Sequence, residues 1–324
     1  MEKIIIWRMC MKVLFHQVKR ELYCQYKSKY ILLLFLTLLG LCVLSTYTQM
    51  NVLTSREHRL SETQKMYEKD GISLEQALKE DLTVKNDGNL EEISNILKYD
   101  YFRYIAAKNA LAPLNAPNQF FTSSALLFLP IILGIYFAYV AIIDYKNGTL
   151  KTQLLYSDFR NYFFSKLISL FLITIFSIIN VTILSIVIQK LFNIIFQIKT
   201  NSTVSFINLL PKQLLYELIS LFIVGLAVFL ITFLLKSHVF SIIMLLLYML
   251  LIPNLGGIDF TNLMLLITSK LFNTSASSVE MIQGQDVNLV SSSFLLVLVL
   301  FLFGAATYYF VKMRECPKQS NFEQ

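Results

Sequence analysis

Long apolar stretches without a charged side chain alternate along the chain with polar segments. Six of these stretches are long enough to cross a membrane, at residues 30–55, 109–143, 167–189, 218–235, 237–258 and 287–311. A helix needs about 20 mostly apolar residues to cross roughly 30 Å of hydrocarbon, and a charge at its centre costs roughly 2.5–3.5 kcal/mol. Trimming the polar and proline-rich ends predicts transmembrane helices near residues 31–48, 124–143, 167–189, 214–235, 239–253 and 291–311.

We therefore predict an all-α polytopic membrane protein with six transmembrane helices. An interfacial amphipathic helix is expected before the first of them, and a helical external loop domain between the first and the second. The composition agrees, because 56% of the residues are apolar and only 15% are charged, whereas about a quarter of the residues of a soluble globular protein are charged. A shorter apolar stretch, Phe260–Phe272, contains Lys270 and is predicted as an external interfacial or re-entrant helix.

Basic residues near the ends of the spans indicate the orientation of the chain. Ten of the 28 basic residues lie in the first 30 residues and in the tail after the last span, and the 144–166 loop and Lys236 add to the same side. This predicts a multi-pass protein of the cell membrane with both termini in the cytoplasm. Lys190, Lys199 and Lys212 oppose this orientation but are outnumbered. Because the topology accounts for the net charge of +7, no nucleic acid is expected as a partner.

The predicted topology divides the chain into four regions. Residues 1–29 form a cytoplasmic amphipathic helix, with the alternative that they continue the first span into the cytoplasm. Residues 30–49 form the first transmembrane helix, and residues 50–121 form an external helical segment. Residues 122–324 form a five-helix transmembrane region, with a short cytoplasmic helix within 144–166.

Helix-capping signals occur in the external segment. Ser73 is followed three residues later by Gln76, and Asn89 is followed by Glu92, which is the spacing of an N-cap pair. After the second pair, apolar residues recur at helical spacing from Leu90 onward. We therefore predict a helix that begins at each pair.

The residues that most catalytic, metal and cofactor sites need are missing or scattered. His16, His58 and His238 stand singly, and none of the four cysteines lies in the external segment. None of the ten glycines is followed by lysine, so the phosphate-binding loop of P-loop ATPases is absent. We expect no catalytic residue, no metal and no cofactor in this chain, and we do not expect it to be an enzyme.

The loop between the second and third spans has the most distinctive pattern. Asn147-Gly148 is predicted as a turn that ends the second span, and Thr149 as the cap of a short helix with Leu150, Leu154 and Leu155 on one side. Ser157 is predicted to cap the next helix, with Asp158 in its first turn. Such a helix, held between two spans, suits either the transmission of force from a soluble partner or an ordinary tight loop.

This segment resembles the coupling-helix region of type-2 ABC exporter permeases. Members of that family show an acidic residue, then Gly-Thr-Leu, a leucine pair, a Ser/Pro-x-Arg element and a lysine that opens the third span. The matching residues here are Asp144, Gly148, Thr149, Leu150, Leu154, Leu155, Ser157, Arg160 and Lys166. The chain departs from the family in having Asp144 where glutamate is more usual, and Tyr156-Ser157-Asp158 where a proline is often found.

The resemblance implies the membrane-spanning permease subunit of a bacterial ABC transporter, with ATP hydrolysis on a separate ATP-binding subunit. Such a permease is similar to half of a dimeric pore, so a homodimer or a heterodimer with a second permease is implied within the lipid bilayer. The resemblance also implies export. Apolar spans with few charges argue against a path for a small polar ion, so we expect an amphipathic or hydrophobic substrate such as a peptide, lipid or drug. The residues expected to couple to the ATPase are Asp144, Asn147, Gly148, Thr149, Leu150, Leu154, Asp158 and Arg160.

Two polar residues within the spans are candidates for the substrate path, namely Asn180 and Glu217. Each also has a structural interpretation, because Asn180 can bond a neighbouring helix and Glu217 is favoured by the dipole at a helix N-terminus. The alternative function is that of a membrane-anchored sensor or immunity protein that binds an external ligand through residues 50–121. A secondary transporter would normally show charges at the midplane or an internal repeat, and the sequence has neither.

Overall fold

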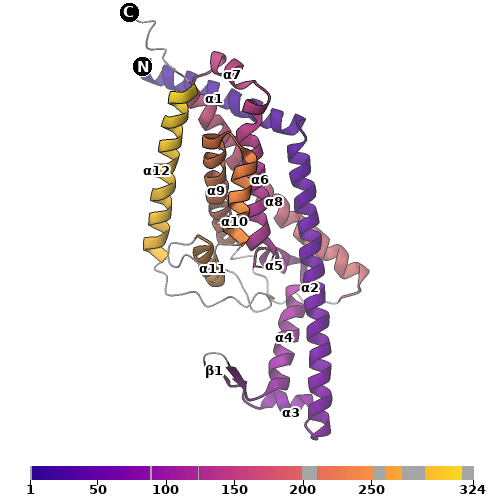
Figure 1. Cartoon of the computed structure of the whole chain (residues 1–324). Coiled ribbons are helices and arrows are strands. Elements are labelled where there is room, and N and C mark those ends of the chain that lie inside the picture. The colour runs from indigo at the N-terminus through magenta and orange to yellow at the C-terminus, as the bar shows by residue number, and fades with distance from the viewer. Residues whose placement is uncertain are drawn as a thin grey trace, which may run out of the picture.

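Most of the chain is helical in the computed structural model (Figure 1), which describes residues 2–87, 90–122, 124–198, 210–250, 260–271 and 289–315. The helices are α1 (Glu2–Lys27), α2 (Tyr30–Lys69), α3 (Leu74–Lys79), α4 (Ile96–Ala110), α5 (Ala116–Thr122), α6 (Ser124–Lys146), α7 (Leu150–Tyr156), α8 (Phe159–Ile195), α9 (Leu210–Leu235), α10 (His238–Leu250), α11 (Phe260–Leu271) and α12 (Leu289–Glu315). Two short strands, β1 (Val84–Asp87) and β2 (Leu90–Ile93), form an antiparallel pair.

The molecule consists of a helical bundle and a stalk that projects from one end of it. Helices α1 and α7 cover the opposite end, where α12 also finishes (Figure 1). Helices α2, α6, α8 and α9 are long and apolar enough to cross a membrane, and α10 is a shorter apolar helix. These helices confirm a polytopic helical membrane protein. The predicted helix at Phe260–Phe272 is present as α11.

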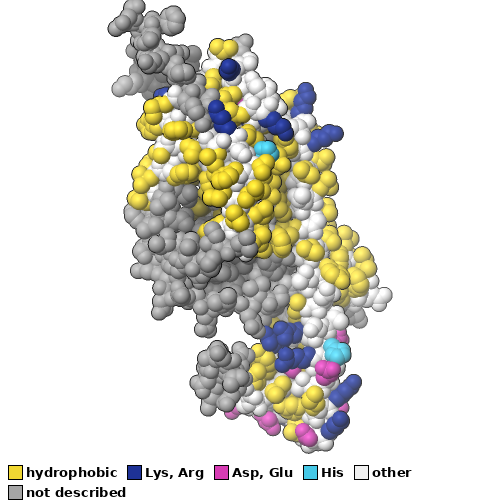
Figure 2. Space-filling model, in the orientation of Figure 1, with side chains coloured by type: hydrophobic (Ala, Val, Ile, Leu, Met, Phe, Trp, Pro, Cys, Tyr) yellow, Lys and Arg dark blue, Asp and Glu magenta, His cyan; other side chains and the backbone are white. Residues whose placement is uncertain are grey.

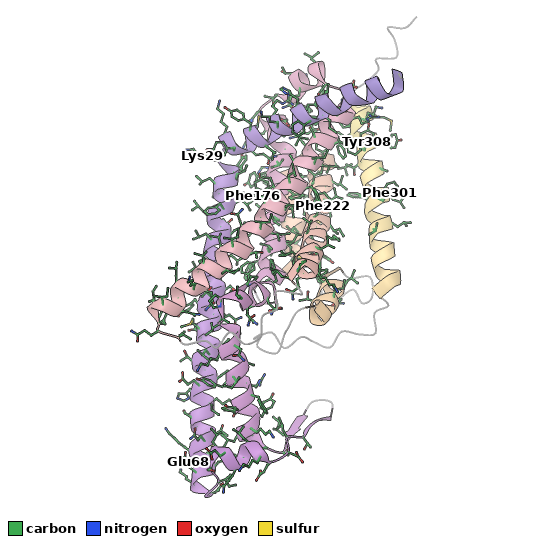
Figure 3. All side chains as sticks on the ribbon, turned by 180° about the vertical axis from the view of Figure 1, so that it is seen from behind. Lys29, Glu68, Phe176, Phe222, Phe301 and Tyr308 are labelled. Atoms are coloured by element: carbon green, nitrogen blue, oxygen red, sulfur yellow. The ribbon has the colours of Figure 1, made fainter. Side chains whose placement is uncertain are left out.

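The N-terminal helix is separate from the first span. Helix α1 ends at Lys27, Lys29 adopts a left-handed conformation with φ of 63°, and α2 begins at Tyr30. Figure 3 shows Lys29 at this corner, with α1 lying across the end of the bundle. The side of α1 that packs against the bundle is polar, because Gln17, Glu21 and Gln25 are buried on it. The alternative in which α1 continues the first span therefore does not describe this structure.

The stalk is a direct continuation of the first span. Helix α2 runs unbroken for 40 residues to Lys69, so the predicted boundary at residues 49/50 is not a break in the backbone. Helix α4 packs against this extension. Asp100 on α4 is buried between the helices, where it accepts a hydrogen bond from the Thr63 hydroxyl (2.8 Å) and forms an ion pair with the Arg59 Nε (3.1 Å).

One of the two predicted helix starts in the stalk is wrong. The Ser73–Gln76 capping box is present at the start of α3, but Leu90–Ile93 is a strand paired with Val84–Asp87. Helix α4 begins only at Ile96, where the Asn95 side chain accepts from the Lys98 N–H and donates to the Ala77 carbonyl. Gly88-Asn89 lies between the paired residues and is a typical sequence for a two-residue hairpin loop, a signal that the capping interpretation of Asn89 overlooked.

Close packing of α6, α9 and α10 forms the centre of the bundle. At Gly225 on α9 the Phe137 ring of α6 comes so near that an added Cβ would lie 2.7 Å from it. Gly134 on α6 is similarly covered by Leu245 of α10. Glycine at these positions lets the helices approach each other, as small residues generally do in membranes.

Nearer the α7 end of the bundle, aromatic rings fill the space between α8, α9 and α12. Phe163 lies edge-on to Phe229, Phe233 and Tyr308, with ring centroids 5.4–5.8 Å apart. Tyr308 is labelled on α12 in Figure 3. Because these rings interdigitate, this end of the bundle is a packed core.

We predict that Gly225→Ala destabilises the protein by about 1–3 kcal/mol, because the buried Phe137 ring has no room to retreat. The matched control is Gly40→Ala in α2, where nothing lies within 4 Å of an added Cβ. Thermal unfolding in detergent should show a lower melting temperature for Gly225→Ala and an unchanged or higher one for Gly40→Ala. Equal melting temperatures for the two variants would contradict this packing.

Candidate functional site

A single carboxylate ties the short helix α7 to the spans on either side of it. Asp144, in the last turn of α6, is buried and accepts four hydrogen bonds. Its Oδ1 accepts from the Thr149 hydroxyl (3.0 Å) and the Gln153 amide (2.6 Å), and its Oδ2 accepts from the Tyr162 hydroxyl (2.9 Å) and the Lys166 ammonium (2.6 Å). Because these donors come from both ends of the loop, α6, α7 and α8 are joined at one point.

The turn between α6 and α7 is built by the backbone around Gly148. Gly148 has φ of 67°, its N–H donates to the Tyr145 carbonyl, and the Thr149 N–H donates to the Asp144 carbonyl. This pair of hydrogen bonds is a Schellman motif, in which glycine takes the left-handed position without strain. The turn places Thr149 directly beside the Asp144 carboxylate.

Lys166 extends the connection to the N-terminal helix. Its ammonium is completely buried in α8 and contacts the Glu21 carboxylate of α1 at 3.2 Å as well as the Val140 carbonyl of α6 at 3.2 Å. We call Glu21, Asp144, Thr149, Gln153, Tyr162 and Lys166 the Asp144 network. It contains residues of α1, α6, α7 and α8.

A second buried contact lies next to the Asp144 network. The Gln25 side chain of α1 accepts a hydrogen bond from the Tyr136 hydroxyl of α6 (2.7 Å) and donates to the Ser169 hydroxyl of α8 (3.1 Å). Helix α1 is therefore attached to the bundle by two polar contacts, one turn apart along its length.

The charged groups of the Asp144 network can stay buried only while each of them keeps its partners. Two carboxylates and one ammonium are removed from water, and each alone would cost several kcal/mol to bury. The ammonium between the carboxylates and the hydroxyl and amide donors around Asp144 offset that cost. A displacement of α7 that separates any of these groups is therefore opposed, because it would leave a buried charge without its partner.

The other side of α7 is open to solvent. Leu155 is 82% exposed, and Lys151, Asp158 and Arg160 are exposed around it. The core of a protein interface is apolar and its rim is polar, so Leu155 with these charged neighbours could be covered by a partner protein. Leu150 points the opposite way and is buried in the core of the bundle.

The structure divides the predicted coupling residues into two groups. Asp144, Leu150 and Leu154 face the bundle, while Asn147, Gly148, Thr149, Asp158 and Arg160 lie on the exposed side. One of the two capping predictions is wrong. Thr149 occupies the N-cap position of α7, as predicted, although its hydroxyl donates to Asp144 and makes no capping hydrogen bond. The N-cap position of α8 is held by Asp158 and not by Ser157, whose hydroxyl donates back to the Gln153 carbonyl.

Sequence reasoning missed Glu21, Gln153 and Tyr162. Glu21 is one of only two acidic residues in the first 30, and it faces a lysine at the start of the third span. The opposite charges of Glu21 and Lys166 were the one feature of the sequence that could have identified Glu21. The hydrogen bonds from Gln153 and Tyr162 to Asp144 depend on how α7 packs against the ends of α6 and α8.

The two candidate substrate-path residues have different surroundings. Asn180 is only partly buried, and its amide donates to the Phe176 carbonyl of its own helix. Glu217 is 3% exposed on α9, and its Oε1 accepts no hydrogen bond from the described residues. Within the part of the chain that the structure describes, no group of three or more His, Cys, Asp or Glu side chains could hold a metal ion.

Comparison with known protein families gives a match over nearly half of the chain. The family described as "ABC-2 family transporter protein" matches residues 94–252, which extend from the start of α4 to the end of α10 and include α7. No curated protein and no solved structure is significantly similar to the chain.

We predict that Lys166→Met destabilises the protein by about 3–5 kcal/mol, because it leaves Asp144 and Glu21 buried without their counter-ion. The exposed Lys151→Met is the control and should change stability by no more than about 0.5 kcal/mol. Thermal unfolding in detergent measures both.

A triple variant, Glu21→Gln with Asp144→Asn and Lys166→Met, removes all three charges. It should be more stable than Lys166→Met alone, since no uncompensated charge then stays buried. If Lys166→Met unfolded at the temperature of the unsubstituted protein, the Asp144 network would not be holding these helices.

Proposed function

We propose that this chain, a member of the ABC-2 family of transporter proteins, is the membrane-spanning permease subunit of an ABC exporter. The observation that carries the proposal is the buried attachment of α7 to three other helices through Asp144 and Lys166. A loop that merely joins two spans needs no such anchoring. A helix that receives force from a soluble partner does.

In the proposed topology the chain crosses the membrane six times, through α2, α6, α8, α9, α10 and α12. The position of α1, α7 and the end of α12 at one end of the bundle supports a common side for the termini and the coupling helix (Figure 1). The basic residues at that end support the cytoplasm as that side. We accordingly propose residues 1–29 as cytoplasmic, 30–49 as the first span, 50–121 as external and 122–324 as the remaining five-helix region.

The ATP-binding subunit is proposed to dock on the exposed side of α7. Leu155 would supply an apolar anchor, and Arg160 and Lys151 would supply charged contacts at its rim. When the ATP-binding subunits close, they push α7, and the Asp144 network transmits the displacement to α6, α8 and α1. This chain contributes no nucleotide chemistry in that scheme.

The substrate path is proposed to lie between two copies of the permease, or between this chain and a related one. The packed aromatic rings around Phe163 argue against a path through a single bundle. Apolar side chains that face outward, such as Phe176 and Ile179 of α8, are suited to an amphipathic or hydrophobic substrate. Asn180 lies beside them, whereas Glu217 is buried on α9 and so would not line a path between two copies.

The docking surface can be tested by co-purification of the full chain with a co-expressed ABC ATP-binding subunit. Leu155→Asp should weaken the complex about tenfold or more, because it places a charge where an apolar anchor is needed. Met66→Asp is the matched control, since Met66 is also exposed, at 64%, but lies in the stalk. Equal recovery of the ATP-binding subunit with both variants would overturn the proposed docking surface.

A further inference from the structure

One buried carboxyl group has no counter-ion among the described residues. Four acidic side chains are buried in that part of the chain, and three of them, Glu21, Asp100 and Asp144, form ion pairs with a lysine or an arginine. The fourth, Glu217 on α9, is 3% exposed, forms no ion pair there, and its Oε1 accepts no hydrogen bond there. The described residues therefore balance every buried carboxylate except this one.

Glu217 lies inside the bundle, toward the end from which the stalk projects. Gln213, one turn earlier on α9, is completely buried, and its amide donates a hydrogen bond to the Asn118 Oδ1 next to it (3.2 Å). Asn118 belongs to α5, which lies at this end of the bundle (Figure 1). Side chains of a helix lean toward its N-terminus, so the Glu217 carboxyl group leans toward the level of this contact. The contact is made by amides, which carry no charge.

The part of α6 at the level of Glu217 is apolar. The C-terminal ends of α6 and α9 are in contact through two aromatic rings whose centroids are 5.7 Å apart, so the two helices run in the same direction. Phe137 of α6 lies against Gly225 of α9. Eight residues earlier on each helix, Leu129, which is completely buried, is therefore at the level of Glu217.

The spans that pack around α9 contribute no charge at this depth. They have no Asp, Glu, Lys or Arg within their apolar parts, which are residues 30–55, 109–143, 167–189 and 287–311. These ranges include all of α5. In α10 the only residue of charged type is His238, which contacts the Tyr139 ring near the α7 end. A counter-ion for Glu217 is therefore not available from α2, α5, α6, α10 or the apolar parts of α8 and α12.

Three lysines and one tyrosine remain to be considered at this end of the bundle. Lys190 on α8 and Lys212 on α9 are exposed. Tyr216, next to Glu217 in sequence, donates its hydroxyl to a backbone carbonyl of α11 (2.9 Å). Lys270 belongs to α11, and its side chain lies outside the described residues, so Lys270 is one of the positions substituted below.

A carboxylate in these surroundings is strongly disfavoured. On the face shown in Figure 2, hydrophobic side chains predominate on the bundle between the basic α7 end and the charged stalk, as expected of the membrane-spanning part. A charge inside that part costs free energy unless a partner or water compensates it. A neutral carboxylic acid avoids most of this cost.

We propose that Glu217 is a proton-binding site and that its side chain is a neutral carboxylic acid in this conformation. The carboxylate reaches this state by taking a proton from hydronium, which leaves water, and the reverse step releases the proton. Release requires water at the buried side of α9, so the proton stays bound while α5, α6 and α9 pack together. Opening of this end of the bundle favours release. Exchange with the outer side of the membrane rests on the topology given under the proposed function.

The direct test is infrared spectroscopy of the full chain in a maltoside detergent at pH 7. The unsubstituted protein should show the C=O stretching band of a protonated carboxyl group, and Glu217→Gln should lose that band. Glu57→Gln, on the exposed part of α2, is the matched control. It should lose only carboxylate bands, because an exposed glutamate is ionised at this pH.

Thermal unfolding gives a second readout. Unfolding brings Glu217 into water, where a glutamate ionises above about pH 4.3. Between pH 5 and pH 7 the ratio of folded to unfolded protein should therefore fall about tenfold per pH unit relative to Glu217→Gln, because unfolding releases one extra proton. Similar melting temperatures of the two proteins at pH 5 show that the variant is folded.

Retention of the band in Glu217→Gln, its loss in Glu57→Gln, or an equal pH dependence of unfolding would overturn the proposal. A band that appears only in Lys270→Met would overturn it as well, since Glu217 would then be ion-paired with Lys270. So would a band that appears only when sodium and potassium are replaced by choline, since Glu217 would then hold a metal cation. Because the measurements use this chain alone, their outcome is independent of whether an ATP-binding subunit docks on α7.

Discussion

The ammonium of Lys166 is completely buried in α8, and the arrangement of the α7 end of the bundle follows from the need to neutralise it. Its counter-ions come from two directions, Asp144 on α6 and Glu21 on α1. A buried charge that loses its partner costs several kcal/mol, so separating α1, α6 and α8 would cost at least that much free energy. Because Asp144 also accepts hydrogen bonds from Thr149 and Gln153, the same requirement fixes α7.

The same requirement attaches α1 to the bundle. An amphipathic helix that only lay in the membrane interface could shift relative to the spans. Here Glu21 and Gln25 attach the buried side of α1 to α6 and α8. At the other end of the bundle the first span continues without a break into the stalk. A displacement that begins at α7 can thus reach the stalk at the opposite end of the bundle through continuous helix, since α2 has no break between Tyr30 and Lys69.

Much of the fold could be predicted because the thickness of the bilayer sets the length of a span, and the free-energy cost of a charge inside the bilayer keeps charged residues out of it. Apolar stretches gave the long helices, and the Asn147-Gly148 turn and the Ser73–Gln76 capping box are local signals that their own residues determine. The polar side of α1 was not predicted, since the partners of Glu21 and Gln25 lie more than a hundred residues away and no local pattern marks the contacts. The helix predicted to begin at Asn89 is wrong because Leu90–Ile93 pairs with Val84–Asp87 as a strand, and the helical spacing of the apolar residues did not reveal this pairing.

The central claim is that α7 faces the cytoplasm, where an ATP-consuming partner can reach it. Labelling with a membrane-impermeant maleimide tests this in intact cells, with Leu155→Cys and Met66→Cys placed separately in a chain whose four native cysteines are serine. The account predicts that residue 66 is labelled in intact cells and that residue 155 is labelled only after the membrane is opened. Labelling of residue 155 in intact cells would contradict it.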